Sequence, residues 1–459
     1  MKKNLAKLLT LTLLIINTFS FNVFAEDSDV IVKDEDFFRA IKSYILKNYE
    51  GDISEEELIE GAVDGMFDKL DKHSYYMPKD ESSDFIRQTT GEFFGIGASI
   101  GVRDDQLKII KVLENTPAQD AGLLKDDIIL QIDGEDVIDA KKIDKHIEKI
   151  RGKKGSVVTL GVLRGTNKMD ISITRDRIEI NPVTKKIIAN HIGYLKIEDF
   201  NSNVSKNVNE AIETLQKQTV KKLIVDLRNN PGGSLGEVVL VAQNFIDKGT
   251  IVSVNYSDGT KKTLKSYGNK KFDDVVVLIN NGSASASEIL AGAIQDTKSG
   301  VLVGKTSYGK GTVQELKKFK NDESLKLTIG RYYLPSGRSI NDTGLVPDYE
   351  IDRFKDESTI KDNLSIDTKS DIVINEVGLE VVRLQNMLDS MGYKIEDGSG
   401  MYNESTKNAV SNFQKNNNLN ATGIANIETV KKILSNYAEH MRKDEFDEQL
   451  KKAIELLNK

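Results

Sequence analysis

Residues Val275–Glu288 read VVVLINNGSASASE, an apolar β-branched run followed by a turn and a cluster of serines. The apolar run predicts a buried strand, and Asn280-Asn-Gly282 predicts the turn that ends it. The residues that follow predict a helix whose inward face carries Ile289, Leu290 and Ile294. This strand-turn-helix unit indicates an α/β core with the serines at the carboxyl end of a strand.

The same plan occurs upstream. Lys222–Arg228 predicts a second buried strand, Asn229-Asn-Pro-Gly-Gly233 a glycine turn, and Leu235–Phe245 a helix. Open α/β sheets place their sites at the carboxyl ends of strands, so we expect the two turns to meet at one sheet edge. Backbone N–H groups at a helix start are suited to bind a developing oxyanion.

A lysine and a glutamine follow the serine cluster: Lys310, between two glycines, is twenty-five residues after Ser285, and Gln314 is four residues further on. A serine hydroxyl needs an adjacent base to act as a nucleophile. A buried lysine can supply that base because desolvation lowers the pKa of its ammonium. None of the four histidines, at 73, 146, 191 and 440, lies in the serine segment, which favours a Ser-Lys pair without excluding a histidine triad.

A purely structural interpretation of the serines is equally compatible with the local pattern. Ser283 or Ser285 would then cap the helix, and the apolar residues behind them would pack inward. The choice between structure and chemistry depends on the remaining motifs.

Together these motifs make the sequence similar to the carboxyl-terminal processing peptidases, the tail-specific protease family that uses a Ser-Lys dyad. The similarity continues through Tyr332–Arg338 and Gly344–Asp348, interpreted as the closing strand and turn of the core. The resemblance implies that Ser285 is the nucleophile, Lys310 the general base and Gln314 the residue that orients the lysine. It also implies an oxyanion hole formed by the N–H groups of Ala286 and of Gly232 or Gly233. The core, residues 177–352, would be of the ClpP/crotonase-like α/β type.

Length and composition agree with a multidomain α/β protein. The chain has 459 residues, enough for about three domains, with 39% hydrophobic residues and a net charge of −7. Mild acidity gives no support for nucleic-acid binding. The absence of cysteine excludes disulfides and thiolate chemistry, and we find no metal-ligand cluster and no phosphate loop, so no cofactor or metal is expected.

The N-terminus predicts export. Three lysines, Lys2, Lys3 and Lys7, precede an apolar run to Phe24, and Val23-Phe-Ala25 fits cleavage before Glu26, which makes residues 1–25 a signal peptide. An uncleaved membrane anchor is the alternative, although the run is shorter and more polar than a spanning helix requires. The mature protein would be extracytoplasmic, either secreted or associated with the cell wall or membrane.

Two regions precede the core. Residues 26–90 predict a helical region with a capping box at Ser54–Glu57, and Gly61–Ser74 resembles the N-terminal helical region of the family. Residues 91–176 resemble a β-rich PDZ domain, with a helix at Ile143–Ile150. The resemblance implies that Phe94, Gly95, Ile96 and Gly97 hold the free C-terminus of a peptide that adds to the sheet edge. We expect Arg151 to report occupancy of this site to the core.

Three segments follow the core. Residues 353–374 are charged and poorly patterned, which predicts a linker. Residues 375–437 resemble a small three-helix peptidoglycan-binding module. Residues 438–459 predict a C-terminal helix with an apolar stripe of Phe446, Leu450, Ile454 and Leu457, which would form a homodimer contact or pack onto its own chain.

Two classes of function fit these features. The first is an exported serine endopeptidase that cleaves protein or peptide substrates chosen by their C-terminal tails, with the PDZ module regulating it and the wall module localising it on peptidoglycan. The second is a catalytically silent, wall-bound PDZ scaffold that binds peptide C-termini. The joint presence of Ser285, Lys310, Gln314 and both glycine turns favours the enzyme.

Overall fold

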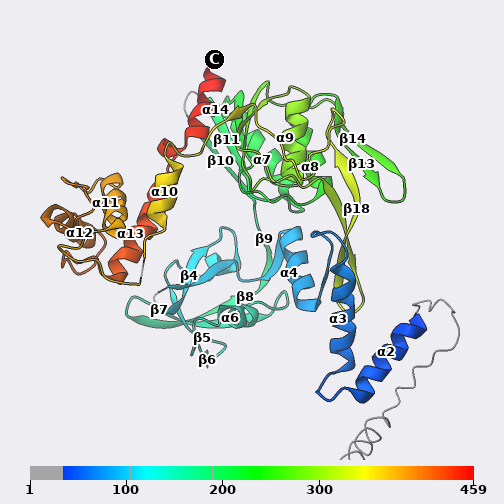
Figure 1. The fold of residues 1–459 in the computed structure, drawn as a ribbon, viewed down its shortest axis with the longest axis horizontal. Coiled ribbons are helices and arrows are strands. Elements are labelled where there is room, and N and C mark those ends of the chain that lie inside the picture. The colour runs from blue at the N-terminus through cyan, green and yellow to red at the C-terminus, as the bar shows by residue number, and fades with distance from the viewer. Residues whose placement is uncertain (1–34, 104, 189–190, 368) are drawn as a thin grey trace, which may run out of the picture. The chain divides into compact units, whose positions relative to one another are not determined.

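The computed structural model describes residues 35–103, 105–188, 191–367 and 369–459 (Figure 1). The predicted signal peptide lies outside these residues. Within them, no helix combines the length and the apolar character needed to cross a membrane. The chain forms two compact units, one ending at Asp71 and the other comprising Lys72–Lys459.

The first unit contains two described helices, α2 (Glu35–Asn48) and α3 (Glu55–Phe67). The predicted capping box is present, since the Ser54 hydroxyl accepts the Glu57 N–H at 3.1 Å and the Glu57 carboxylate accepts the Ser54 N–H at 2.7 Å. Neither helix has a buried residue, so their apolar side chains remain largely exposed.

The second unit is built on a six-stranded sheet. Its strand order is β10 (Val183–Ile188), β11 (Ile192–Ile197), β12 (Lys222–Asp226), β15 (Asp274–Ile279), β16 (Val301–Gly304) and β19 (Tyr349–Glu350). The pairs from β11 to β19 are parallel, and only β10 with β11 is antiparallel. The predicted strands at 222–228 and 275–279 are therefore neighbours at the centre of the sheet.

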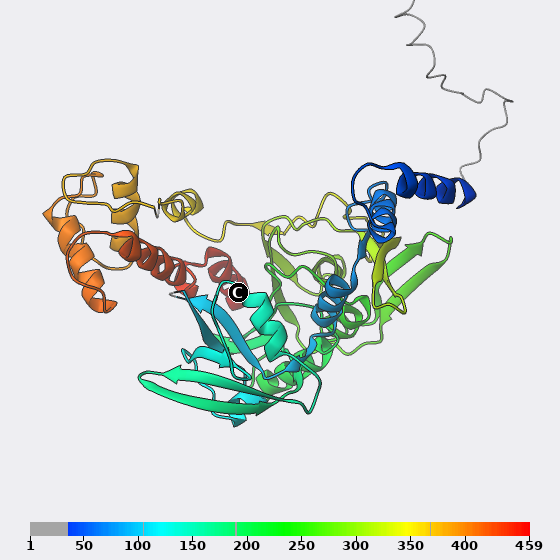
Figure 2. The ribbon, with the colours of Figure 1, turned by 90° about the horizontal axis from the view of Figure 1, so that it is seen from below.

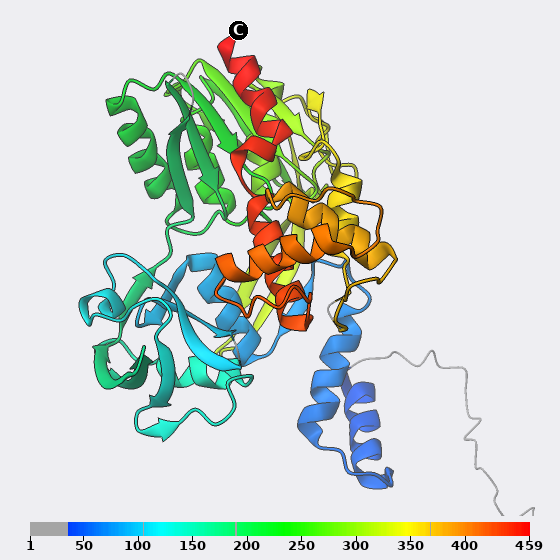
Figure 3. The same cartoon turned by 90° about the vertical axis from the view of Figure 1, so that its left-hand side faces the viewer.

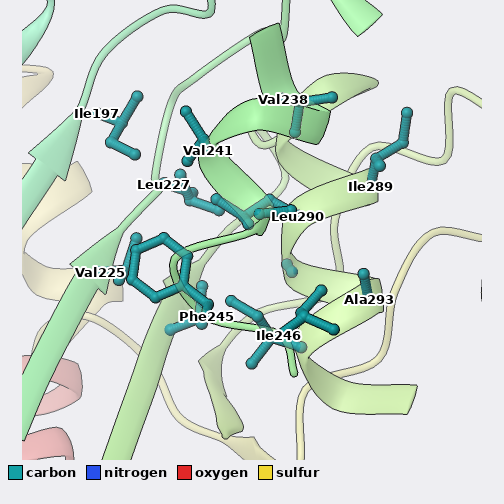
Figure 4. Packing of buried hydrophobic residues seen from close by; sticks show 14 of the residues in the cluster. Ile197, Val225, Leu227, Val238, Val241, Phe245, Ile246, Ile289, Leu290 and Ala293 are labelled. Carbon is teal, nitrogen blue, oxygen red and sulfur yellow. The ribbon is translucent and has the colours of Figure 1, made fainter. Parts of the chain in front are cut away.

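Three helices cover one face of this sheet: α7 (Val204–Lys217), α8 (Leu235–Ala242) and α9 (Ala286–Asp296). Figure 4 shows side chains of this layer from the sheet, α8 and α9 gathered around Phe245 and Leu290. Alternate residues of β12 and β15, including Val225 and Val277, point into it. The same two strands also bury residues of the opposite parity, including Ile224 and Val276, so the second face of the sheet is covered as well.

That cover is the C-terminal helix α14 (Glu448–Asn458), red in Figure 3. Its Leu450, Ala453 and Leu457 pack against Ile224, Val276 and Leu278 of the sheet. Leu450, Ile454 and Leu457 of the stripe predicted as a homodimer contact therefore pack on their own chain, the alternative that the sequence left open. Phe446, the fourth residue of the stripe, lies before α14 in η3 and is partly buried. The core also extends beyond the predicted boundary at residue 352, because its second layer comes from residues 448–458.

A second sheet borders the core. It has the order β1 (Tyr75–Met77), β18 (Ser324–Tyr333), β13 (Gly249–Tyr256) and β14 (Lys261–Ser266), and β17 (Thr312–Lys318) also pairs with β18. The expectation of a purely helical region over 26–90 is wrong here, since β1 adds to β18 before α4 (Lys79–Thr90) begins. The hydroxyls of Ser82 and Ser324, 2.7 Å apart and buried, join α4 to the same strand.

The PDZ-like domain has its own sheet and core, with the long hairpin of β7 and β8 visible in Figure 2. The sheet order is β3 (Ala98–Arg103), β4 (Gln106–Val112), β5 (Ile128–Ile132), β7 (Val157–Arg164) and β8 (Asn167–Thr174), with β6 (Glu135–Asp136) on β5. Helices α5 (Pro117–Asp120) and α6 (Ile143–Ile150) complete it, and α6 has the predicted bounds. Strands β2 (Glu92–Gly95) and β9 (Asp176–Glu179), which come before and after this sheet in the sequence, pair with each other as a separate antiparallel ladder.

The C-terminal domain contains α11 (Leu379–Ser390), α12 (Glu404–Asn416) and α13 (Ile427–His440) around a common core, followed by η3 (Asp444–Phe446). The prediction of a linker at 353–374 is wrong, because α10 (Glu357–Leu364) forms there and Ile366 and Ile372 are buried in the same core. The segment is mostly charged, so its few apolar residues did not form a pattern that predicts a helix or a buried position. Helix α13 also continues past the predicted boundary at residue 437.

A buried ion network joins α14 to the end of β12. The Arg228 guanidinium contacts Asp226 at 2.6 Å and Asp447, the N-cap residue of α14, at 2.7 Å. It also bonds Gln449 at 2.9 Å. All four side chains are buried.

Replacing Arg228 with methionine is expected to lower the free energy of unfolding by about 3–5 kcal/mol, because the Asp226 carboxylate is then buried without a cation. Calorimetric unfolding measures the change. The control is Lys305→Met, which removes exposed ion pairs with Glu350 and Asp352 and should cost at most about 1 kcal/mol. Equal effects of the two substitutions contradict the structural role given to the network.

Candidate active site

The two predicted turns meet at the carboxyl ends of β12 and β15. The side chains of Asn229 and Asn280 bond at 2.9 Å, and the Asn280 carboxamide oxygen also accepts the Asn229 N–H at 2.9 Å. The Ala284 N–H donates to the Asn230 carbonyl at 3.0 Å. Neighbouring parallel strands bring their carboxyl ends to one edge, so this meeting follows from the sheet order.

The three serines of the cluster differ in what their hydroxyls contact. Ser283 is buried and donates to the Leu227 carbonyl at 2.8 Å, and Ser287 is buried and donates to the Asn230 carbonyl at 2.9 Å. Both hydroxyls therefore hold the serine segment against the glycine turn. Ser285 is half-buried and lines a cleft.

Ser285 has a strained backbone, with φ 53° and ψ −113°, immediately before α9 begins. A non-glycine residue in the left-handed half of φ space costs on the order of 1–3 kcal/mol and persists only where its surroundings hold it. Here the Ser285 N–H donates to a Glu288 carboxylate oxygen at 2.8 Å. The strain directs the side chain out of the strand-to-helix turn.

Glu288 is the residue of this site that sequence reasoning missed. Its buried carboxylate accepts the Ser285 N–H, the Gly309 N–H at 2.7 Å, the Lys310 N–H at 2.9 Å and the Ser307 hydroxyl. Burial raises the pKa of Glu288 above its ordinary value, and these four donors oppose that rise. One side chain thus ties the serine turn to the lysine loop. The acid stands three residues after Ser285, a spacing that sequence reasoning took as ordinary helix.

All six residues predicted for catalysis and oxyanion binding line one cleft of about 450 Å³. They are Gly232, Gly233, Ser285, Ala286, Lys310 and Gln314. Lys310 is half-buried. The Gln314 carboxamide nitrogen donates to the hydroxyls of Thr312, at 2.7 Å, and Thr328, at 3.3 Å, which fixes the plane of the amide.

The glycine turn lies directly against the serine. A Cβ atom added to Gly232 would stand 2.7 Å from Ser285 Cβ and 3.0 Å from the Ala286 nitrogen, so only glycine permits this approach. The Gly232 N–H already donates to the Asn230 side chain at 2.9 Å. Within the described parts of the chain, the N–H groups of Gly233 and Ala286 have no such protein acceptor. Of the two glycines predicted as alternatives, the geometry therefore favours Gly233.

Three further polar residues, not predicted from the sequence, line the cleft. The buried Tyr332 donates its hydroxyl to the Ser285 carbonyl at 3.4 Å. Asp199 is half-buried, and burial raises the pKa of its carboxyl to about 6. Lys326, on β18, is also half-buried. Their signal in the sequence is weak, because only the sheet order brings residues 199, 326 and 332 to this edge.

A second, smaller cavity of about 260 Å³ lies between β3 and α6 in the PDZ-like domain. It is lined by the predicted Gly95, Ile96, Gly97 and Arg151, and by the apolar residues Phe93, Ile100, Ile147 and Ile150. The predicted Phe94 is instead 49% exposed and is replaced in the lining by Phe93. The reason is strand alternation, which points neighbouring residues to opposite faces.

Arg151 links this cavity to helix α4. Its guanidinium stands over the Phe93 ring at 5.8 Å and is 3.8 Å from the Asp84 carboxylate on α4. Helix α4 also carries Phe85 and Thr89, which line the cleft that contains Ser285. In the described residues, no group of three or more His, Cys, Asp or Glu side chains is placed to hold a metal ion.

Asp199 gives a pH-dependent stability. Its pKa of about 6 exceeds the ordinary 3.8, so the folded state binds the proton more tightly than the unfolded state. The free energy of unfolding contributed by Asp199 is therefore present below about pH 4 and is lost as the pH rises to about 6. Melting temperatures measured across this range should fall for the wild type relative to Asp199→Asn. Glu213→Gln, an exposed acid on α7, is the control, and a parallel course of wild type and Asp199→Asn contradicts the assignment.

Comparison with known proteins identifies three domains. Residues 191–351 match the model of peptidase family S41, residues 95–174 match the PDZ domain, and residues 377–433 match a peptidoglycan binding domain. In the photosystem II D1 C-terminal processing protease, a solved structure, 27% of the aligned residues are identical; the match covers 70% of this chain and 88% of that one, with a TM-score of 0.41.

The curated relatives match along nearly the whole chain. Carboxy-terminal processing protease CtpA of Bacillus subtilis (strain 168) is 33% identical over 432 residues, which cover 93% of this chain and 91% of that protein. A CtpA-like serine protease of Staphylococcus aureus (strain COL) is 32% identical over 94% of this chain and 86% of its own length. With an S41 peptidase domain at its centre and such relatives over its whole extent, this chain belongs to the CtpA-like carboxy-terminal processing proteases of peptidase family S41, which are serine-type hydrolases.

Proposed function

We propose that this protein is an exported serine endopeptidase that uses a Ser285–Lys310 dyad and selects substrates by their C-terminal tails. The observation that carries the proposal is the cleft in which Ser285, Lys310 and Gln314 meet the glycine turn. The hydroxyls of Ser283 and Ser287 donate to carbonyls of residues 227 and 230, whereas Ser285 stands at the N-cap of α9 with a strained backbone and lines the cleft.

In the proposed reaction, Lys310 in its neutral form takes the proton of the Ser285 hydroxyl as the oxygen attacks the substrate carbonyl. The N–H groups of Gly233 and Ala286 bind the oxyanion that forms. The lysine then gives its proton to the leaving amine, and water hydrolyses the acyl-enzyme by the same steps. Gln314, held by two threonines, orients the lysine, and Glu288 keeps the serine turn and the lysine loop in register.

The second candidate, a catalytically silent scaffold that binds peptide C-termini at the wall, has weaker support. A scaffold has no need of the strained Ser285 backbone or of a buried carboxylate that spans two loops, and both carry an energetic cost. The PDZ and peptidoglycan-binding domains fit either candidate. We therefore favour the enzyme.

Substrate selection is assigned in this proposal to the PDZ cavity. Among the described strands, β3 pairs with β4 alone, so its other edge can accept an added peptide strand next to α6. The apolar side chains of Ile100, Ile147 and Ile150 suit an apolar C-terminal residue. Arg151, through Asp84 on α4, connects this cavity to the helix that lines the catalytic cleft.

Location and assembly complete the proposal. The peptidoglycan-binding domain and the CtpA relatives support association with the cell envelope, and we propose that residues 1–25 direct export. We also assign the core to the ClpP/crotonase type, on the basis of its largely parallel sheet covered on both faces. We also propose a homodimer. Its contact is not formed by the apolar side of α14, because Leu450, Ala453 and Leu457 are buried against the sheet of their own chain.

The dyad is tested with an unfolded peptide substrate and the protein lacking residues 1–25. Ser285→Ala and Lys310→Ala should each lower kcat by at least about 10³-fold, because the nucleophile and its base act as a unit. Ser257→Ala, at an exposed serine between β13 and β14 and outside the cleft, is the control and should retain most turnover. Full activity of either dyad variant refutes the mechanism, and loss in all three with altered melting points to a folding defect.

The PDZ assignment predicts a preference for free C-termini. The wild type should cleave a peptide with a free apolar C-terminus faster than its C-terminal amide, and Ile147→Glu should bring the ratio of the two rates close to one. Asp84→Asn, which removes the α4 partner of Arg151 outside the cavity, should lower the same ratio without changing the affinity of the PDZ cavity for the peptide. The control is Ile138→Glu, since Ile138 is 93% exposed and outside the cavity. An unchanged ratio in Ile147→Glu rules out this site of recognition.

A further inference from the structure

The catalytic cleft contains a second lysine, Lys326, that the proposed dyad does not use. It lies on β18, which pairs with the edge strand β17. In that ladder Gln314 stands opposite Thr328 and Leu316 stands opposite Lys326. The 3.3 Å bond between the Gln314 and Thr328 side chains shows that they share a face of the ribbon.

Strand geometry places Lys326 on the same face. Residues two apart on a strand point to the same side, so Lys326, two residues before Thr328, lies about 7 Å from it along β18. Gln314, Leu316 and Lys326 all line the cleft. The position of Lys326 is therefore displaced from that of Gln314 by two residues of an extended strand. Alternate side chains of a bound peptide strand have the same spacing.

The Lys326 ammonium is held by two aromatic rings. It lies 5.1 Å from the centre of the Tyr75 ring and 4.7 Å from that of Phe85, and it donates to the Tyr75 hydroxyl at 3.2 Å. In the described parts of the chain, no carboxylate oxygen is within ion-pair distance of it. By contrast, the buried Arg228 of the core has two carboxylate partners, Asp226 and Asp447.

An ammonium in this setting lacks part of the stabilisation that water or an anion would provide. Burial lowers the pKa of Lys326 below its ordinary value, which shows the cost of keeping its charge. The aromatic rings supply some compensation and also limit the rotamers of the side chain. A carboxylate that enters the cleft would meet a preorganised cation with little further loss of side-chain entropy.

We propose that Lys326 forms a carboxylate-binding subsite of the cleft. This subsite selects substrates that carry an acidic group about two residues away from the substrate residue that lies beside Gln314. The carboxylate is either an Asp or Glu side chain or the α-carboxylate of a substrate that ends within the cleft. This inference rests on the proposed function, since it assumes that a peptide lies in the cleft. It assigns to Lys326 a role in specificity, separate from the chemistry of Ser285 and Lys310.

Binding is measured with the full-length Ser285→Ala protein, so that the result does not depend on turnover. Three fluorescent peptides share one apolar sequence: one has an internal glutamate and a C-terminal amide, one has glutamine and the amide, and one has glutamine and a free C-terminus. The position of the glutamate is scanned on both sides of the cleavage site. We expect the best glutamate peptide to bind about fivefold more tightly than its glutamine counterpart.

Three substitutions in the same background assign this preference to the lysine. Lys326→Met keeps the length and the contact with both rings and should bring the glutamate-to-glutamine ratio close to one, whereas Lys326→Arg should keep it. The control is Lys317→Met, which removes an exposed charge of the same ribbon outside the cleft. A preference that persists in Lys326→Met overturns the proposal. So does a failure to prefer either glutamate at any scanned position or the free C-terminus.

Two further measurements separate the remaining possibilities. If Lys326 takes an α-carboxylate instead, the free-C-terminus peptide alone shows a preference that Lys326→Met abolishes, whereas recognition by the PDZ cavity is unaffected by that substitution. If Lys326→Met does not fold, the salt dependence of the wild-type ratio decides, because an ion pair weakens as salt rises and an apolar contact does not. Turnover by the wild type is assayed in parallel. Its failure on all peptides contradicts the dyad, without affecting the binding result for Lys326.

Discussion

The carboxylate of Glu288 is the interaction on which the active site depends. Serine and lysine arrive at the cleft from different elements, α9 and the loop before β17, and the chain between them passes through β16. A buried acid that accepts N–H groups from both segments fixes their separation with one rigid group. Burying such a carboxylate is costly unless its oxygens are fully bonded, so the four donors and the acid require one another.

The bond between the Ser285 N–H and Glu288 also accounts for the strained backbone at Ser285. A positive φ at a serine has no local benefit, and the residue would relax if its N–H were released. The bond to Glu288 and the close approach of Gly232 together hold it. The proposed nucleophile is thus positioned by its backbone, while its neighbours Ser283 and Ser287 provide the hydroxyl bonds that fasten the turn.

Much of this arrangement could be predicted from the sequence, because apolar runs that end in glycine turns specify neighbouring parallel strands. The strands at 222–226 and 274–279, the helix at 143–150 and the meeting of the two turns follow from such local patterns. Glu288, Asp199 and Lys326 could not be found in this way, since their environments depend on the sheet order. Helix α10 was missed, and the surface that covers α14 was left open, for a related reason: a short apolar stripe does not reveal which surface covers it.

The position of α14 has a consequence for how the protein is made. The helix that covers the second face of the catalytic sheet is encoded after the peptidoglycan-binding domain, in the last residues of the chain. Until Asp447 and Leu457 have left the ribosome, Arg228 lacks one of its carboxylates and one face of the sheet is uncovered. The order of synthesis therefore delays covering of the second face of the sheet until the PDZ-like and peptidoglycan-binding domains have been made.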